Sequence, residues 1–181
     1  MTEDKYYFEK EKFSLPEFKF SFIFDKELLR EILNYKKSGK VLDLGCGEGG
    51  IDLELAKLGF DVTCVDISKT ATEKIKEESK KRKLKVKVIC EDLEEYFIDE
   101  EFDIIIFTGV SHFIPQKIAK LIIKKIKEHT AKNGINVVDV LTGKDFFAEG
   151  EIKKIYSDWE IIEFEEYKES FGKMNYLVGR K

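Results

Sequence analysis

The chain has 181 residues, of which 43% are hydrophobic and 38% charged, so it can form a globular domain with a substantial core. Its 32 basic and 36 acidic side chains give a formal charge of −4, which offers no general attraction to a phosphate backbone and argues against a nucleic-acid partner. No apolar run reaches the roughly 20 residues that cross a bilayer, and the acidic N-terminal segment lacks the apolar stretch of a signal peptide. We therefore expect a cytoplasmic protein that does not enter a membrane.

The first part of the chain is rich in aromatic residues. They include Tyr6, Tyr7, Phe8, Phe13, Phe18, Phe20, Phe22 and Phe24. The spacing of two from Phe18 to Phe24 predicts an extended arm. Its aromatic side chains either pack on the protein core or form a lid over bound ligands. We expect an aromatic arm and a helix in residues 1–38, packed on a single domain at residues 39–181.

Strand-like and helix-like segments alternate from Lys40 onward. The expected strands are Val41–Leu44, Asp61–Asp66, Val86–Cys90, Phe102–Phe107 and Ile135–Leu141. The expected helices are Ile51–Leu58, Lys69–Arg82 and a third that begins near Pro115 and ends at Asn133-Gly134, with Ile118, Leu121, Ile122 and Ile126 on its buried face. This alternation predicts right-handed βαβ units in a doubly wound parallel sheet.

The C-terminal part departs from that alternation. A short helix at Glu151–Tyr156 precedes two strand candidates, Trp159–Glu165 and Met174–Gly179. The connection between these strands is too short for a crossover helix, so they should form an antiparallel hairpin at the sheet edge. The predicted fold is α/β, a Rossmann-like sheet of five parallel strands plus this hairpin.

The three cysteines, Cys46, Cys64 and Cys90, lie in or beside predicted buried strands. They are odd in number and lack the paired spacing of a metal site. We expect reduced thiols that serve as small apolar side chains, and no bound metal.

A glycine-rich loop follows the first expected strand. Gly45, Gly47 and Gly50 match the G-x-G-x-x-G spacing of dinucleotide-binding loops, with Asp66 at a suitable distance for ribose hydroxyls. Asp43 should face the ligand crevice, where its carboxylate would repel a pyrophosphate. It would favour S-adenosylmethionine, which carries a cationic sulfonium and an ammonium group but no phosphate.

Two further carboxylates end the next expected strands. Asp66 has two oxygens that can each accept a ribose hydroxyl, although it can instead cap the following helix. Asp92 can accept a hydrogen bond from the adenine amine while Leu93 lies against the ring, unless it is only an exposed turn residue. Ligands of open α/β sheets bind at the carboxyl ends of strands, so these positions predict one cofactor site.

The fourth expected strand leads into Thr108–Phe113, where a substrate should meet the sulfonium methyl group. His112 is the candidate general base because its pKa ordinarily lies near neutrality. A lone histidine at such a place also serves as a cap or packing residue. The absence of a Pro-Pro-aromatic sequence argues against methylation of a flipped DNA base.

Four segments together resemble the class I S-adenosylmethionine-dependent methyltransferases over roughly residues 40–140. They are Leu42–Gly47, Val65-Asp66, Glu91–Leu93 and Phe102–Ile105. The C-terminal segments Phe147–Ile152, Tyr156 and Asp158–Glu160, with Tyr7-Phe8, resemble the tellurite-resistance (TehB-like) methyltransferases.

The resemblance implies a seven-stranded Rossmann-like fold and methyl transfer to a small soft acceptor such as a tellurium or selenium oxyanion. The implied cofactor-binding residues are Asp43, Gly45, Cys46, Gly47, Asp66, Ile67, Asp92, Leu93 and Thr108. The expected substrate pocket includes Tyr7, Phe113 and Phe147. Members of the resembled family carry a basic pair and a further arginine before the final strand. This chain has only Lys168 and Lys173 there.

Two alternatives remain open at this point. One is a nicotinamide-dependent Rossmann oxidoreductase, and the other is a non-catalytic module that binds S-adenosylmethionine. We expect a monomer or a homodimer.

Overall fold

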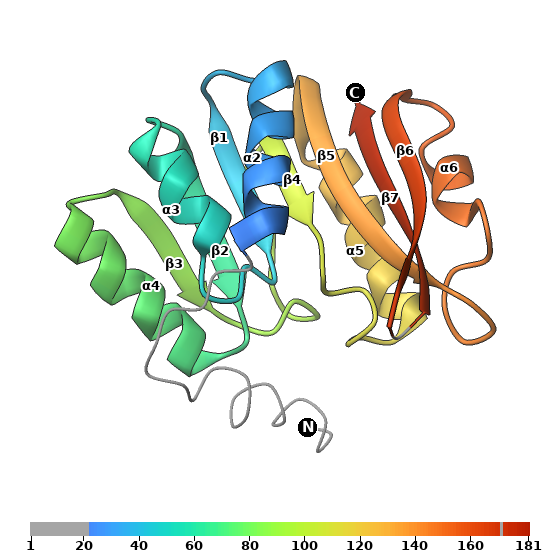
Figure 1. Cartoon of the computed structure of the whole chain (residues 1–181), viewed down its shortest axis with the longest axis horizontal. Helices are drawn as coiled ribbons and strands as arrows, with labels where there is room; N and C mark the ends of the chain where they lie inside the picture. The colour runs from blue at the N-terminus through green and yellow to red at the C-terminus, as the bar shows by residue number, and fades with distance from the viewer. Residues whose placement is uncertain (1–21, 171) are drawn as a thin grey trace. The chain divides into compact units, whose positions relative to one another are not determined.

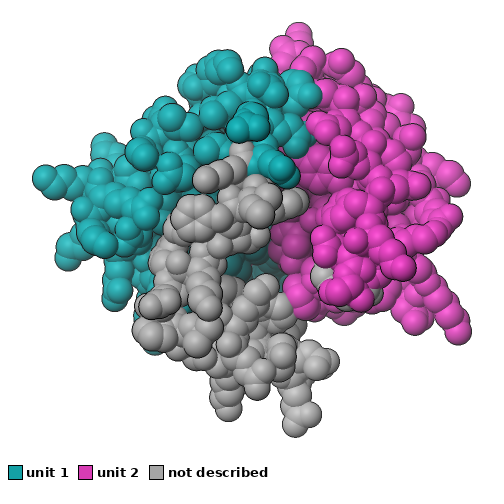
Figure 2. Space-filling model, viewed as in Figure 1, with its two compact units in different colours: residues 1–95 teal, residues 96–181 magenta. Residues whose placement is uncertain are grey.

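The computed structural model describes residues 22–170 and 172–181, and it gives side-chain environments from residue 27 onward (Figure 1). The chain divides into two compact units, residues 1–95 and residues 96–181 (Figure 2). Seven strands form a mixed sheet in the order β3-β2-β1-β4-β5-β7-β6. None of the helices in the described part of the chain has the length and hydrophobicity that crossing a membrane requires.

The described part of the first unit, from residue 22 onward, contains three parallel strands and three helices. They are α2 (Phe22–Tyr35), β1 (Lys40–Leu44), α3 (Gly50–Lys57), β2 (Asp61–Asp66), α4 (Lys69–Arg82) and β3 (Val86–Cys90). In the pairing of β1 with β2, Leu44 lies opposite Val65, and Asp66 of β2 lies opposite Cys90 of β3. Parallel pairing places the carboxyl ends of all three strands at one edge, so the loops that follow them are neighbours.

The start of α2 corrects the interpretation of the phenylalanine repeat. Phe22 and Phe24 belong to a helix, although their spacing predicted an extended arm. Four phenylalanines at a spacing of two are a weak signal for an extended segment. A longer helical pattern, which includes the buried residues Leu28 and Ile32, agrees with the observed helix. The predicted arm at residues 6–20 lies outside the described residues.

The second unit contains one parallel and two antiparallel pairings. Its elements are β4 (Phe102–Phe107), α5 (Gln116–Glu128), β5 (Thr130–Thr142), α6 (Glu151–Ile155), β6 (Glu160–Glu169) and β7 (Gly172–Arg180). Strand β4 pairs with β5 in parallel, whereas β7 is antiparallel to both β5 and β6. The predicted α/β fold with a C-terminal antiparallel hairpin is thereby confirmed.

One expectation for the second unit was wrong, and another was correct only in part. Asn133-Gly134 does not end α5, because β5 begins at Thr130 and continues through both residues. The register of β4 and β5 shifts here from Phe102–Thr130 to Ile104–Ile135, and Asn133 has a φ of 62°. The pair therefore forms a bulge within a strand, for which a left-handed residue is suited.

The buried stripe of α5 agrees with the expected one at Ile122 and Ile126 and differs at the other positions. Leu121 is 48% exposed, and the buried residues are Ala119, Ile122, Ile123 and Ile126. These positions follow the i, i+3, i+4, i+7 spacing of a single helix face.

Candidate functional site

The loop after β1 is tied to the end of β2 by backbone hydrogen bonds. The amides of Gly45 and Cys46 donate to the carbonyl of Val65, at 2.7 and 3.2 Å. Gly45 and Gly47 have φ values of 85° and 55°, which L side chains adopt only with strain. The glycines therefore let the loop turn back along β2 at close range.

Asp66 contacts both the glycine loop and the residue that begins α4. One carboxylate oxygen accepts the amide of Gly47 at 2.8 Å, and the other accepts the amide of Ser68 at 2.8 Å. The Ser68 hydroxyl in turn caps α4 by accepting the amide of Ala71. Each carboxylate oxygen has more than one lone pair, so both retain capacity for a ribose hydroxyl. The alternative role considered for Asp66, capping of the following helix, belongs to Ser68 instead.

Glu48 and Gly49 connect the loop to α4. Glu48 pairs with Lys74 at 2.6 Å, and both side chains are less than a fifth exposed. Gly49 precedes α3 with a φ of 71°, and a Cβ there would lie 2.8 Å from the side chain of Ile75. A side chain at this position would be strained by the positive φ and would clash with Ile75. Glycine therefore allows the loop to pack directly against α4.

Asp43 lies in β1 opposite Cys64, and it is 5% exposed. Its carboxylate acts electrostatically on the thiols of Cys46 and Cys64. Burial, followed by interactions with Cys64 and the nearby carboxylates, raises the pKa of Cys46 well above its ordinary value. For Cys64 the hydrogen bond with Cys46 lowers the pKa, but burial and the carboxylates outweigh it and raise the value to about 12.

The third carboxylate and its neighbours follow β3. Asp92 accepts the amide of Glu94 at 3.1 Å, and the Leu93 side chain is buried. The amide of Glu91 donates to the carbonyl of Asp66, and the Cys90 thiol lies 3.6 Å from the carbonyl of Ile67. The cofactor-site residues predicted in the first unit therefore lie in the last residues of β1 and β2 or in the loops after β1, β2 and β3, at one sheet edge. Cys90 is exposed, although we expected it to be buried.

The second unit places Thr108 and Gly109 directly after β4. The Gly109 amide donates to the carboxylate of Asp139 at 2.9 Å, and Asp139 is 3% exposed. Burial raises the pKa of Asp139 to about 7, although hydrogen bonds from the Gly109 amide and the Tyr167 side chain lower it. Asp139 therefore holds the turn that carries Thr108 and titrates near neutrality.

The other predicted residues of this unit have different environments. The ring of His112 contacts that of Phe113 in a tilted arrangement with centroids 3.8 Å apart, and Phe113 is 46% exposed. Phe147 is 1% exposed, so its predicted place in a substrate pocket has no support from its burial. Tyr7 lies outside the described residues.

The C-terminal motif around Tyr156 is a packing cluster. The buried Tyr156 hydroxyl donates to the amide oxygen of Asn136 at 2.9 Å, and its ring meets Trp159 edge to face. Lys127 lies over both rings and pairs with Asp158 at 2.5 Å. These residues join α5, β5 and the segment before β6, so their visible role is structural.

Two buried carboxylates were not identified as candidate site residues from the sequence. Asp139 lies within an otherwise apolar run of β5, and this position in the sequence could have indicated a buried carboxylate. Asp52 is fully buried in the first turn of α3 and lies beside Cys46 and Cys64. No sequence spacing indicates that group, because three separate elements bring its members together.

Comparison with known proteins identifies relatives along most of the chain. A family model described as "Tellurite resistance protein TehB" matches residues 6–176. The chain is 36% identical over 146 residues to a Haemophilus influenzae protein named "Probable S-adenosyl-L-methionine-dependent methyltransferase TehB". That alignment covers 75% of this chain and 50% of the relative. The chain thus spans about half the length of this curated relative.

Solved structures agree with this likeness. The crystal structure of TehB from Haemophilus influenzae has a TM-score of 0.78 and 29% identity, covering 98% of this chain and 67% of that one. The magnesium protoporphyrin IX methyltransferase (ChlM) of Synechocystis PCC 6803, solved with bound SAM, also has a TM-score of 0.78. It is 17% identical, with coverage of 100% and 98%, and shows the shared fold.

Proposed function

Because the chain belongs to the TehB family of class I S-adenosylmethionine-dependent methyltransferases, we propose that it transfers the sulfonium methyl group of this cofactor to a small-molecule acceptor. The observation that carries the proposal is the contact of the Asp66 carboxylate with the Gly47 amide at 2.8 Å. It joins the glycine loop to the carboxylate that is suited to a ribose. Family membership disfavours the nicotinamide-dependent alternative.

The residues of the first unit fit this cofactor. Asp66 retains acceptor capacity for ribose hydroxyls, and Asp92 and Leu93 follow β3 where an adenine is expected. The carboxylate of Asp43 favours a cationic ligand and opposes a pyrophosphate. The bound cofactor supplies an activated methyl group, so the protein's contribution is chiefly to hold donor and acceptor in attack geometry. Binding roles for Cys46, Ile67 and Thr108 belong to the same proposal.

The acceptor is proposed to be a small molecule with a soft nucleophilic atom, with tellurium and selenium oxyanions as the first candidates. The name of the matching family supports this choice. The charges in the second unit argue for testing other acceptors too. A hollow of about 210 Å³ beside the β6–β7 hairpin includes Lys168 and Lys173, but also Glu149 and Glu166. Lys173 pairs with Glu149 at 2.9 Å, so its charge is not reserved for an anion.

Cofactor binding is tested first by thermal unfolding with S-adenosylhomocysteine. At about 100 times its Kd, the ligand should stabilise the protein by about 2.7 kcal/mol. NADH at matched concentration should give no stabilisation. The opposite pattern would overturn the cofactor assignment.

An acceptor screen then separates an enzyme from a binding module. Selenite, tellurite and neutral thiol, amine and phenol acceptors are incubated with labelled cofactor, and S-adenosylhomocysteine formation is measured. Turnover of any acceptor supports catalysis. Cofactor binding with no turnover across the panel favours the non-catalytic module.

His112 is proposed as a general base only for an acceptor that must lose a proton. A His112→Asn variant should then lower kcat with little change in KM, and the loss should be greatest above the histidine pKa. For an acceptor without a dissociable proton, kcat should remain unchanged.

We also propose a cytoplasmic protein in a monomeric or homodimeric state, without nucleic-acid partners, and a part in tellurite resistance. The net charge of −4 supports the absence of nucleic-acid binding. Free thiols at Cys46, Cys64 and Cys90 are consistent with a reducing compartment. The proposed organisation is an N-terminal segment at residues 1–38 and one methyltransferase domain at 39–181.

A further inference from the structure

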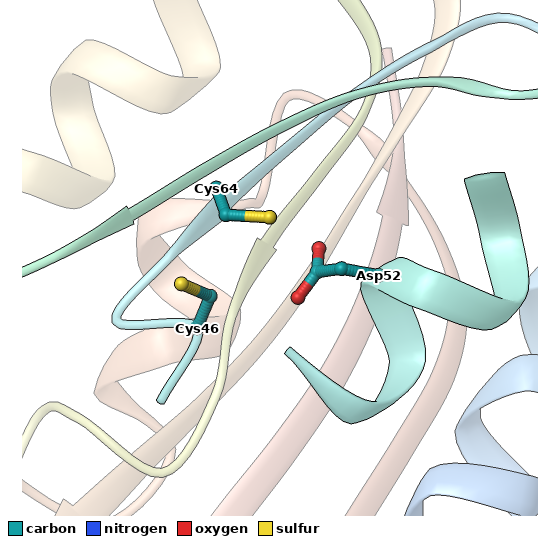
Figure 3. Close-up of side chains that lie close together, drawn as sticks. All are labelled: Cys46, Asp52 and Cys64. Atoms are coloured by element: carbon teal, nitrogen blue, oxygen red, sulfur yellow. The ribbon is translucent and has the colours of Figure 1, made fainter. Parts of the chain in front are cut away.

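Three buried or half-buried side chains meet beneath the glycine loop. Cys46 comes from the loop, Asp52 from the first turn of α3 and Cys64 from the middle of β2 (Figure 3). Their ligand-type atoms, two sulfurs and a carboxylate oxygen, all lie within 4.8 Å of one another. All three residues belong to the first unit, so the group is set by the packing of that unit alone.

The electrostatic surroundings of this group favour a cation. Asp52 and Cys64 are fully buried, and the Cys64 thiol is hydrogen-bonded to both Cys46 and Asp52. The charged groups that act on both thiols are the carboxylates of Asp52 and Asp43. Carboxylates buried next to thiols are costly to desolvate, and a cation bound among them would offset that cost.

The ligand set matches a particular class of metal ion. Thiolates select thiophilic ions, and a mixed set of two sulfurs and one carboxylate oxygen suits Zn²⁺. With bond lengths of about 2.3 Å to sulfur and 2.0–2.2 Å to oxygen, ligand atoms on one tetrahedral ion lie about 3.6–3.8 Å apart. The observed spread of 4.8 Å or less closes to that geometry with small side-chain movements. Cys46, the ligand that the loop contributes, is half-buried rather than fully buried.

We propose that Cys46, Asp52 and Cys64 bind a thiophilic divalent cation of the zinc type, with one coordination position open. The ion joins the cofactor loop, the start of α3 and strand β2. Its role is to brace the loop in addition to the contact between Gly47 and Asp66.

Cobalt titration tests this site in the reduced, full-length chain after chelator treatment. Co²⁺ bound by two thiolates gives sulfur-to-metal charge-transfer absorption in the near ultraviolet, which should saturate at one ion per chain and disappear when Zn²⁺ is added. Cys46→Ser and Cys64→Ser should each weaken the apparent affinity by about 100-fold or more, since even indirect partners of a metal contribute 10–100-fold. Asp52→Asn should also weaken binding but keep the thiolate absorption.

Cys90→Ser is the matched control. Cys90 is an exposed cysteine of the same unit outside the group, so this variant should titrate as the unmodified chain does. Absence of the absorption in the unmodified chain would overturn the proposal. So would absorption that survives in Cys46→Ser and Cys64→Ser, or binding that depends on Cys90 instead.

Alkylation of the unmodified chain tests the site without any substitution, so it remains informative if a variant of a buried residue fails to fold. Zn²⁺ should slow the reaction of Cys46 with iodoacetamide at least tenfold and leave that of Cys90 unchanged, as measured by peptide mass spectrometry. Equal rates at Cys46 with and without Zn²⁺ would exclude the site. Both measurements are made without S-adenosylhomocysteine, so a failed metal site leaves the proposed cofactor binding standing.

Discussion

Asp139 shows how one buried carboxyl group makes stability depend on pH. The folded protein raises its pKa from the ordinary value of 3.8 to about 7. Between these values the folded state binds more protons than the unfolded state, so the contribution of Asp139 to stability falls as pH rises. This contribution is fully present below about pH 4 and is lost above about pH 7.

Asp139→Asn should remove that dependence, because the amide oxygen can still accept the Gly109 amide. The free energy of unfolding, measured in urea from pH 4 to pH 8, should fall for the unmodified chain relative to the variant. The change is at most about 4 kcal/mol, since each pKa unit corresponds to about 1.4 kcal/mol. Parallel curves across this pH range would contradict the assigned pKa.

Gly49 and Gly150 form a matched pair for testing the packing of the loop. Both precede a helix with nearly equal φ, 71° and 68°. A Cβ at Gly150 meets nothing within 4 Å, whereas at Gly49 it would lie 2.8 Å from Ile75.

Gly150→Ala should therefore cost only the left-handed strain of about 1–2 kcal/mol. Gly49→Ala should cost a further 1 kcal/mol or more (roughly 1–3 for overpacking), because fully buried Ile75 cannot move aside. Urea unfolding of the two variants measures the difference. Equal destabilisation would show that Ile75 yields without cost.

At the scale of elements, Tyr156 holds the segment after α6 against β5. Its hydroxyl donates to Asn136, whose amide group donates to the Thr130 hydroxyl at 2.7 Å. Tyr156→Phe leaves the buried Asn136 oxygen without that donor, and we expect a loss of about 1–3 kcal/mol in unfolding free energy. Thermal and urea unfolding measure it. Tyr156→Leu should cost more, since it also removes the ring contact with Trp159. An unchanged free energy of unfolding in Tyr156→Phe would show that the hydrogen bond makes no net contribution to stability.

Elements with strong local signals could be predicted closely from the sequence. The bounds of β2, α4 and β4 match the expected ones, because Asp66, Ser68 and apolar runs mark their ends. The start of β5 could not be predicted, since Asn133-Gly134 resembles a helix stop and becomes a bulge only when β4 lies beside it. The same limit applies to α5, where Ile122 and Ile126 are buried as expected but Leu121 is exposed.

The candidate site divides along similar lines. The glycine loop and the carboxylates at strand ends follow from motif spacing and from the geometry of parallel sheets. The grouping of Asp52 with Cys46 and Cys64 depends on three elements that meet only in the folded unit. The exposure of single residues could also not be predicted from the sequence, because Cys90 is exposed and Phe147 is buried.

At the scale of the whole molecule, the cofactor proposal depends chiefly on the first unit. Asp43 and Asp66 lie near the carboxyl ends of β1 and β2, and Asp92 follows β3, at one edge of the sheet. The second unit contains the hairpin that distinguishes this sheet from the dinucleotide-binding arrangement. The chain matches about half of the length of the Haemophilus relative, so its own activity must be measured directly.

Calorimetric titration with S-adenosylhomocysteine is the most direct measurement of the central claim. The unmodified chain should bind one ligand, and Asp66→Ala should lose at least about 100-fold in affinity, because hydrogen bonds to a charged group contribute about 1.5–3 kcal/mol each. Asp61→Ala, an exposed aspartate at the opposite end of β2, is the control and should bind as the unmodified chain does. Unchanged affinity in a folded Asp66→Ala variant would contradict the account.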